Sequence, residues 1–165
     1  MRDAFPVTTD KAFLDSMVAS VNQYRAKHGV PPVTLDDALV EYANSRASLV
    51  STQEGLSHGH ASLDHGYGEN LSWHASTAQV PAGAEEATSG WYGEIVDYNF
   101  ADPSASGPGA TGHFTQLVWR STTKVGFGRA FGKGGEWWET YIVAIFHPAG
   151  NMQGEYQANV PPASA

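Results

Sequence analysis

The most informative part of this sequence is an eight-residue stretch in its C-terminal half. It reads Gly112-His113-Phe114-Thr115-Gln116-Leu117-Val118-Trp119. A glycine before a histidine indicates a turn that opens a short helix, with His113 at the helix N-terminus. The positive end of the helix dipole disfavours an imidazolium there. The neutral imidazole is the form that binds a metal or accepts a proton, so His113 is a candidate functional residue.

Three further motifs lie on either side of this stretch. The one that follows reads Ser121-Thr122-Thr123-Lys124-Val125-Gly126-Phe127-Gly128, and those that precede it read Tyr67-Gly68-Glu69-Asn70-Leu71 and Trp91-Tyr92-Gly93-Glu94-Ile95. In this order the four motifs resemble the CAP superfamily. That superfamily includes plant pathogenesis-related protein 1, cysteine-rich secretory proteins, insect venom allergens and yeast sterol-exporting proteins. The resemblance runs from about Phe13 to Val160, which is nearly the whole chain.

The resemblance implies an α+β fold, namely a three-layer α-β-α sandwich of the CAP type. It places one CAP domain over residues 10–160. We expect residues 1–9 to be a flexible N-terminal segment and residues 161–165 to be a disordered tail. The length agrees with this organisation, because 165 residues make one ordinary domain.

Hydrophobic periodicity predicts the main elements independently of the resemblance. Three amphipathic helices and two strands are expected, over residues 10–28, 36–52 and 84–98 and over residues 124–131 and 137–147. Residues 101–112 contain glycine and proline but no large apolar side chain, which indicates a long loop. A glycine-rich loop over residues 132–135 would join the two strands as a hairpin.

Composition excludes several classes of function. The net charge is −8 and the nine basic residues are scattered, which argues against nucleic acid and against docking on anionic lipid. No apolar run approaches the ~20 residues of a membrane span. The chain has no cysteine, so disulfides and thiolate zinc sites are excluded. Secreted CAP proteins commonly have Gly-Cys-Gly where this chain has Gly126-Phe127-Gly128, so packing must provide its stability.

In CAP proteins two histidines and two glutamates line one cleft. The resemblance assigns Glu69, Glu94 and His113 to this cleft. His58 fits the position of the first histidine best, and His60 is the runner-up. From the residues alone, each of these side chains could instead be an ordinary surface group.

The chemistry of this cleft favours metal binding. Two neutral imidazoles, His58 and His113, can hold a divalent cation, with zinc the commonest choice. Glu69 and Glu94 would either orient a water molecule on the metal or accept hydrogen bonds from the imidazole N–H groups. Two protein ligands make a weak site. The alternative is a metal-dependent hydrolase or protease that uses the same residues, but no nucleophile motif accompanies them.

A second candidate site lies at the base of the long loop. Trp91, Tyr98, Phe100 and Pro103 would line it. In yeast-type CAP proteins the equivalent loop binds sterol, so the resemblance implies a sterol or a fatty acid as the partner. A mobile loop over an apolar floor makes a plausible lipid cleft. The competing interpretation is that these aromatic side chains belong to the core.

Together these features favour a non-enzymatic protein that binds sterols or fatty acids and has a cleft able to take zinc. We expect an extracellular protein whose signal peptide has been removed. The absence of cysteine keeps a cytosolic protein as the alternative.

Overall fold

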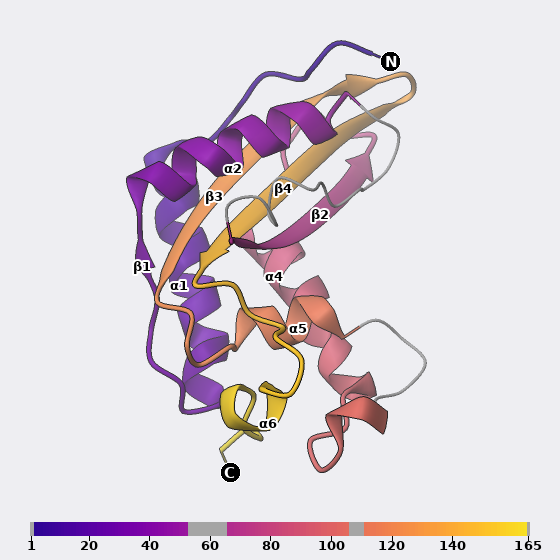
Figure 1. Cartoon of the computed structure of the whole chain (residues 1–165). Coiled ribbons are helices and arrows are strands. Elements are labelled where there is room, and N and C mark those ends of the chain that lie inside the picture. The colour runs from indigo at the N-terminus through magenta and orange to yellow at the C-terminus, as the bar shows by residue number, and fades with distance from the viewer. Residues whose placement is uncertain (1, 53–65, 106–110, 165) are drawn as a thin grey trace.

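The computed structural model describes residues 2–52, 66–105 and 111–164 (Figure 1). Within them one four-stranded sheet lies between helices on both faces, which confirms the predicted α+β, three-layer α-β-α sandwich. In chain order the elements are α1 (Lys11–Lys27), β1 (Thr34–Leu35), α2 (Asp37–Val50), β2 (Gly68–Ser76), α4 (Ala84–Gly93), η1 (Glu94–Asp97), η2 (Pro103–Ala105), α5 (Gly112–Leu117), β3 (Lys124–Gly134), β4 (Trp137–His147) and α6 (Tyr156–Asn159).

The strand order in the sheet is β1-β3-β4-β2. β3 and β4 form the predicted antiparallel hairpin, with Lys124 opposite His147 and Gly134 opposite Trp137. β3 extends beyond the predicted residue 131 to Gly134, so a tighter turn replaces the expected loop. Gly135 has a φ of 86° in this turn, a conformation that glycine adopts without the steric cost of a Cβ.

The sequence did not predict β2, which pairs antiparallel with β4 from Gly68 opposite Phe146 to Ser76 opposite Trp138. Asn70, Leu71 and Ser72 are all buried in this strand. Because polar side chains lie on both of its faces, Asn70 and Ser72 on one and Glu69 on the other, β2 lacks the alternation that normally identifies a strand.

Each face of the sheet contributes to its own hydrophobic cluster. Successive side chains of a strand point to opposite faces, so β4 contributes to both clusters. On the α2 face the cluster includes Leu39, Ala43, Ala47, Tyr141, Val143 and Ile145. On the opposite face it includes Met17, Val21, Trp91, Phe114, Phe127, Ile142, Ala144 and Phe146. Burial on both faces explains the uninterrupted apolar run of β4.

The Gly-Phe-Gly segment of β3 brings α2 directly onto the sheet. A Cβ at Gly126 would overlap the backbone of Leu39, and a Cβ at Gly128 would overlap the backbone of Ala43. Phe127 points to the other face and is fully buried in the cluster there. The two glycines therefore set the distance between α2 and β3, and the phenylalanine contributes to the core.

The predicted helices are found with small differences at their ends. The Asp10 carboxylate caps α1 by accepting from the Phe13 N–H at 2.8 Å, and Asp36 caps α2 in the same way. The third predicted helix, over residues 84–98, instead ends as α4 at Gly93 and continues as the 3-10 turn η1. None of the described helices is long and apolar enough to cross a bilayer.

The two terminal segments contact the rest of the fold at specific residues. In the N-terminal segment, Val7 forms a β-bridge with Ala130, and the Arg2 guanidinium lies 2.9 Å from the Glu139 carboxylate. In the C-terminal segment, the Ser164 N–H donates to the Lys27 carbonyl at 2.7 Å. These contacts are between residues far apart in the sequence, so local composition gave no indication of them.

Candidate functional site

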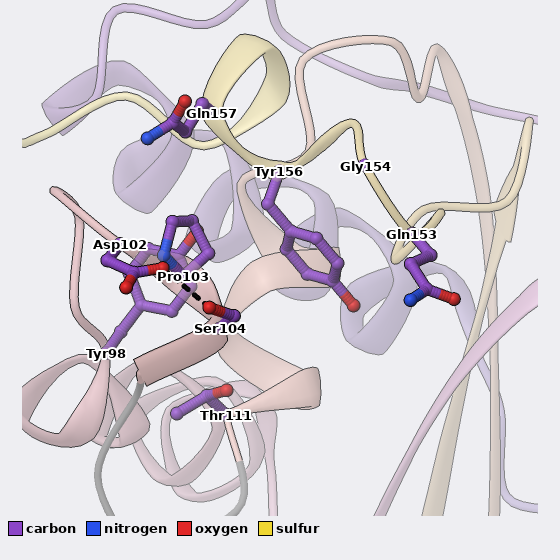
Figure 2. Close-up of a pocket in the computed structure, with 9 residues that line it drawn as sticks. All are labelled: Tyr98, Asp102, Pro103, Ser104, Thr111, Gln153, Gly154, Tyr156 and Gln157. Carbon is purple, nitrogen blue, oxygen red and sulfur yellow. Dashed lines mark hydrogen bonds between the residues drawn. The ribbon is translucent and has the colours of Figure 1, made fainter.

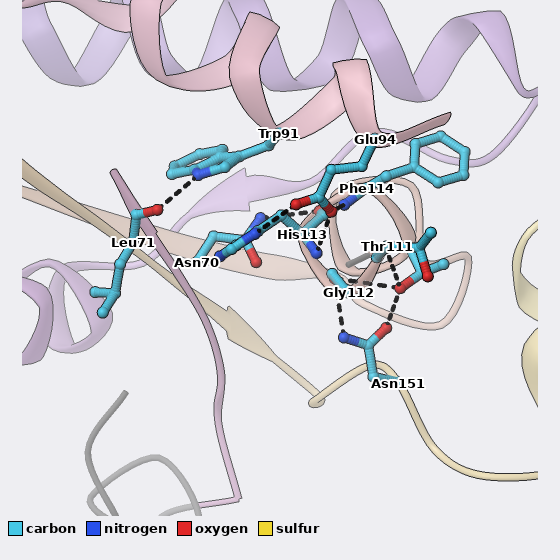
Figure 3. Close-up of polar contacts among 10 residues, drawn as sticks. Asn70, Leu71, Trp91, Glu94, Thr111, Gly112, His113, Phe114 and Asn151 are labelled. Atoms are coloured by element: carbon cyan, nitrogen blue, oxygen red, sulfur yellow. Dashed lines mark hydrogen bonds and ion pairs between the residues drawn. The ribbon is translucent and has the colours of Figure 1, made fainter. Parts of the chain in front are cut away.

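The carboxylate of Glu94 holds the first turn of α5 (Figure 3). Its Oε1 accepts from the backbone N–H of His113 at 2.9 Å and of Phe114 at 3.0 Å, and its Oε2 lies 2.8 Å from His113 Nδ1. A negative charge at a helix N-terminus satisfies N–H groups that have no partner within the helix. The predicted helix opening at Gly112 is confirmed, and Glu94 and His113 lie together as predicted.

The contact with Glu94 determines the tautomer of His113. A carboxylate oxygen only accepts, so Nδ1 carries the proton and Nε2 carries the lone pair of the neutral ring. Trp91 lies nearly parallel to this imidazole, at 17°, with ring centroids 6.5 Å apart. The Asn70 amide donates to the His113 carbonyl at 3.0 Å. The orientation of the imidazole is therefore fixed from several sides.

Glu69 lies on the α2 face of the sheet and forms a buried ion pair. Its carboxylate accepts from Arg46 Nε at 2.7 Å and from Arg46 Nη2 at 3.1 Å, and the two side chains are only 2% and 5% exposed. The pKa of Arg46 is raised, chiefly by its hydrogen bond to Glu69. Glu69 is therefore the ion-pair partner of Arg46, a residue that was not predicted to belong to the cleft.

Of the four cleft residues expected from the sequence, the structure brings Glu94 and His113 together and places Glu69 with Arg46. His58 and its runner-up His60 lie outside the described residues. Among the described residues, no three or more His, Cys, Asp or Glu side chains gather as a metal site would require. The zinc site stays a prediction.

The second candidate site is a cavity of about 480 Å³ between η2 and the segment that leads into α6 (Figure 2). Two of the predicted lipid-binding residues, Tyr98 and Pro103, line it. The other described lining residues come from the loop, from the start of α5 and from the segment after β4. They are Asp102, Ser104, Thr111, Gln153, Gly154, Tyr156 and Gln157.

The other two predicted lipid-binding residues are not among the described residues that line the cavity. Phe100 contacts Tyr98 edge to face, with ring centroids 4.9 Å apart, and also contacts Phe114 at 6.1 Å. Trp91 is 3% exposed in the core, and its indole N–H donates to the Leu71 carbonyl at 2.9 Å. Phe100 therefore supports the cavity wall, and Trp91 belongs to the hydrophobic core.

His28 connects Phe100, which supports this wall, to two other parts of the fold. Its ring lies 6.3 Å from Phe100, Nδ1 donates to the Pro161 carbonyl at 2.8 Å, and Nε2 accepts from the Tyr92 hydroxyl at 2.9 Å. Burial lowers the pKa of His28, and the charge of Lys27 lowers it further against the opposing effect of the Pro161 carbonyl. The imidazole is therefore neutral at pH 7.

Sequence reasoning missed the far wall of the cavity and the partner of Glu69. The far wall follows β4 in a segment without apolar periodicity, so no local signal marks it. Arg46 did give a signal, because it falls among Tyr42, Ala43 and Val50 on the apolar face of its helix. A charged residue at such a position indicates a buried partner.

This chain is similar in sequence to a known protein family and to several known proteins. The family model described as CAP, cysteine-rich secretory protein family, matches residues 18–146. Golgi-associated plant pathogenesis-related protein 1 of Homo sapiens is 36% identical over 157 residues, which are 94% of this chain and 96% of that protein. Protein PRY2 of Saccharomyces cerevisiae is 37% identical over 152 residues, 91% of this chain but only 41% of that protein.

A solved structure, NaASP2 with Zn²⁺, has the same fold, with a TM-score of 0.68 at 19% identity over 94% of this chain and 87% of that one. The family match covers most of the sandwich, from within α1 to the end of β4, and includes both Glu94 and His113. The chain therefore belongs to the CAP family of cysteine-rich secretory proteins.

Proposed function

We propose that this CAP protein binds a sterol in the cavity between η2 and residues 153–157. The cavity is the observation that carries the proposal. Its volume of about 480 Å³ suits a small molecule, because such sites usually measure roughly 300–1,000 Å³. Its wall combines the rings of Tyr98, Pro103 and Tyr156 with a few hydroxyl and amide groups. Such a wall suits a rigid apolar body with one small polar end.

The charge of the wall favours a sterol over a fatty acid. None of the nine described lining residues is Lys, Arg or His, whereas Asp102 is acidic. Ser104 donates a hydrogen bond to the Asp102 carboxylate at 2.6 Å. A fatty-acid carboxylate would lie near this charge with no cation from the described wall, and an unpaired buried charge is costly.

A direct binding assay with purified protein tests this proposal. Cholesterol and palmitate should be titrated separately, because the acidic wall predicts micromolar binding of the sterol and weaker binding of the fatty acid. Palmitate binding tighter than cholesterol would favour the fatty-acid alternative. Binding of neither lipid would contradict the lipid function itself.

A second proposal concerns His113, and the contact with Glu94 favours it. A carboxylate that accepts from one imidazole nitrogen prepares the other nitrogen to bind a metal. Zinc at His113 Nε2 would need a further ligand from the predicted His58 or His60. Glu94 would then fix the ring and raise its basicity. Such a site has few protein ligands, and we expect weak binding.

The hydrolase alternative has less support, because the contacts of Glu94 explain this residue without a reaction. Its two oxygens hold two backbone N–H groups and one imidazole, which stabilises the start of α5. We further propose that the protein acts outside the cell, since the description of its family names secretory proteins. Fractionation of the native host into medium and cells tests this location.

A further inference from the structure

One edge of the central sheet is open over part of its length. The strand order β1-β3-β4-β2 makes β2 an edge strand (Figure 1). In the first half of β2 the Leu71 carbonyl accepts from the Trp91 indole N–H at 2.9 Å, so Leu71 directs its backbone groups away from β4. Backbone groups alternate in direction along a strand, and the register of β2 with β4 is uninterrupted, so Trp73 and Ala75 face the same way as Leu71.

The opposite side of the sheet agrees with this assignment. The Thr8 N–H donates to the Arg129 carbonyl at 2.8 Å and the Phe131 N–H donates to the Pro6 carbonyl at 3.1 Å, so the odd-numbered residues of β3 face away from β4. The registers of β3 with β4 and of β4 with β2 extend this alternation across the sheet and leave the odd-numbered residues of β2 facing outward. The N-terminal segment thus covers part of the β3 edge.

Trp73 and Ala75 have outward-facing backbone groups without partners in the described part of the chain. No described backbone group outside the sheet bonds to the N–H or the carbonyl of either residue. The Trp73 side chain is 43% exposed, and Ala75 is exposed as well. An open strand edge beside an exposed apolar side chain is a template for a further strand.

The exposed indole of Trp73 is held in place before any partner arrives. Its N–H donates to Glu139 Oε1 at 3.0 Å, and the Glu139 carboxylate forms an ion pair with Arg2 at 2.9 Å. The ring therefore has little conformational freedom to lose when a partner binds. The ion pair also neutralises the charge that lies beside the ring.

The charge pattern favours a second copy of this chain as the partner. No Asp, Glu, Lys or Arg occurs from Asn70 to Ala84, although the whole chain has a net charge of −8. Natural sheet edges commonly carry charged side chains that prevent pairing, and this segment carries none. Two like-charged copies can therefore approach each other here without charges of the same sign meeting. A basic partner would find no acidic residue in this segment.

We propose that two copies of the chain pair antiparallel through their β2 edges, about a two-fold axis at His74. In this register Trp73 of each copy lies opposite Ala75 of the other, and each such pair exchanges two N–H···O bonds, so the four open groups of each copy all find partners. Each indole would also cover the small side chain of the opposite alanine. The ladder ends at Leu71, whose carbonyl already accepts from Trp91.

So short a ladder predicts a weak dimer. Its area is small compared with that of stable dimers, so we expect a dissociation constant of roughly 0.1–1 mM. None of the residues of β2 lines the cavity, so this inference does not depend on the proposed lipid function.

Sedimentation equilibrium from about 0.02 to 2 mM protein tests the pairing, and wild type should change from monomer to dimer across this range. Ala75→Pro removes one N–H that each copy donates to the other. The variant should still fold, because this N–H faces away from β4. We expect it to dimerise at least about tenfold more weakly. The matched control Ala75→Ser keeps the N–H and a small side chain, so it should dimerise like wild type. Circular dichroism checks that both variants fold.

Hydrogen exchange of the wild type locates the contact without a substitution. The N–H groups of Trp73 and Ala75 should exchange several-fold more slowly as the dimer forms, whereas those of Ser72 and His74, which face β4, should be protected at every concentration. A dimer that leaves the exchange of Trp73 and Ala75 unchanged, or that Ala75→Pro forms equally well, would overturn the inference. A wild type that stays monomeric throughout would also overturn it and would leave the edge to a strand of another protein.

Discussion

Glu94 contacts His113 twice, once at the backbone N–H and once at the imidazole. The distances are 2.9 Å from Oε1 to the N–H and 2.8 Å from Oε2 to Nδ1. One carboxylate therefore sets both the start of α5 and the tautomer of the ring. The structural role and the candidate chemical role of Glu94 depend on the same side chain, so a substitution must distinguish the two.

Glu94→Gln should make this distinction. The amide oxygen can still accept from the backbone N–H groups of α5, but the amide nitrogen would face His113 Nδ1 with a donor. We expect His113 to change to the tautomer with the proton on Nε2, at a cost of about 1 kcal/mol in stability. Imidazole ¹⁵N chemical shifts report the tautomer directly. An unchanged Nδ1–H tautomer in the variant would show that Glu94 does not determine it.

Zinc binding tests the second proposal. We expect His113→Ala to abolish zinc binding measured by titration calorimetry, and acidification to weaken it because protons compete for the imidazole. The control is His74→Ala, which removes a histidine of β2 whose ring lies 3.2 Å from the Ser72 hydroxyl. Undiminished zinc affinity in His113→Ala would move the metal site elsewhere.

The features that could be predicted from the sequence are those that follow from local periodicity, from glycine positions or from short sequence motifs. The β3–β4 hairpin follows from periodicity and glycine, and α5 follows from Gly112 and His113. The contact between Glu94 and His113 was expected from two motifs that the resemblance placed in one cleft. The contact joins residues 19 positions apart, so the resemblance, and not local periodicity, placed them together.

The features that were missed depend on packing between distant elements. The ion pair of Arg46 and Glu69 forms only because α2 lies across the sheet, where Gly126 and Gly128 permit close approach. The far wall of the cavity forms because the segment that contains Tyr156 returns beside η2 (Figure 2). No sequence period indicates the far wall. The position of Arg46 on the apolar face of its helix indicates a buried partner but does not identify Glu69.

The pH dependence of stability should show the contribution of His28. Its pKa is lowered in the folded protein, so the unfolded chain takes up a proton first as the pH falls. Stability should therefore be full above about pH 6.5, the value of an unperturbed histidine, and should decline as the pH falls below it. Urea unfolding at several pH values between 7 and 5 measures this decline. His28→Gln should remove most of it.

Glu139 provides an internal comparison at lower pH. Its pKa is lowered by Arg2 from the usual 4.5, so its contribution to stability is present above that value and is lost as the pH falls through the folded pKa. Glu139→Gln should therefore alter the acid limb below pH 4.5 and leave the decline between pH 7 and 5 in place. If the stability of His28→Gln still declines between pH 7 and 5, a group other than His28 causes the decline.

Phe100 should matter for sterol binding through the wall that it supports. Phe100→Ala removes the half-buried ring that packs on Tyr98 and Phe114, an apolar contact of at most about 2 kcal/mol. We expect cholesterol affinity to fall tens-fold, because Tyr98 would no longer be held at the cavity. His113→Ala should leave sterol affinity nearly intact, whereas a hydrolase that uses His113 would lose its activity in that variant.

Phe131→Ala is the matched control for this experiment. Phe131 stacks on Trp138 with ring centroids 5.4 Å apart in the β3–β4 hairpin, and neither residue lines the cavity. The Phe131→Ala variant loses a similar aromatic contact, but the cavity lining is unchanged. It should therefore be less stable than wild type and still bind cholesterol with the same affinity. Circular dichroism must show that both variants fold. If Phe131→Ala and Phe100→Ala lose affinity to the same extent, the loss reflects general destabilisation, and the sterol does not depend on the wall beside Tyr98.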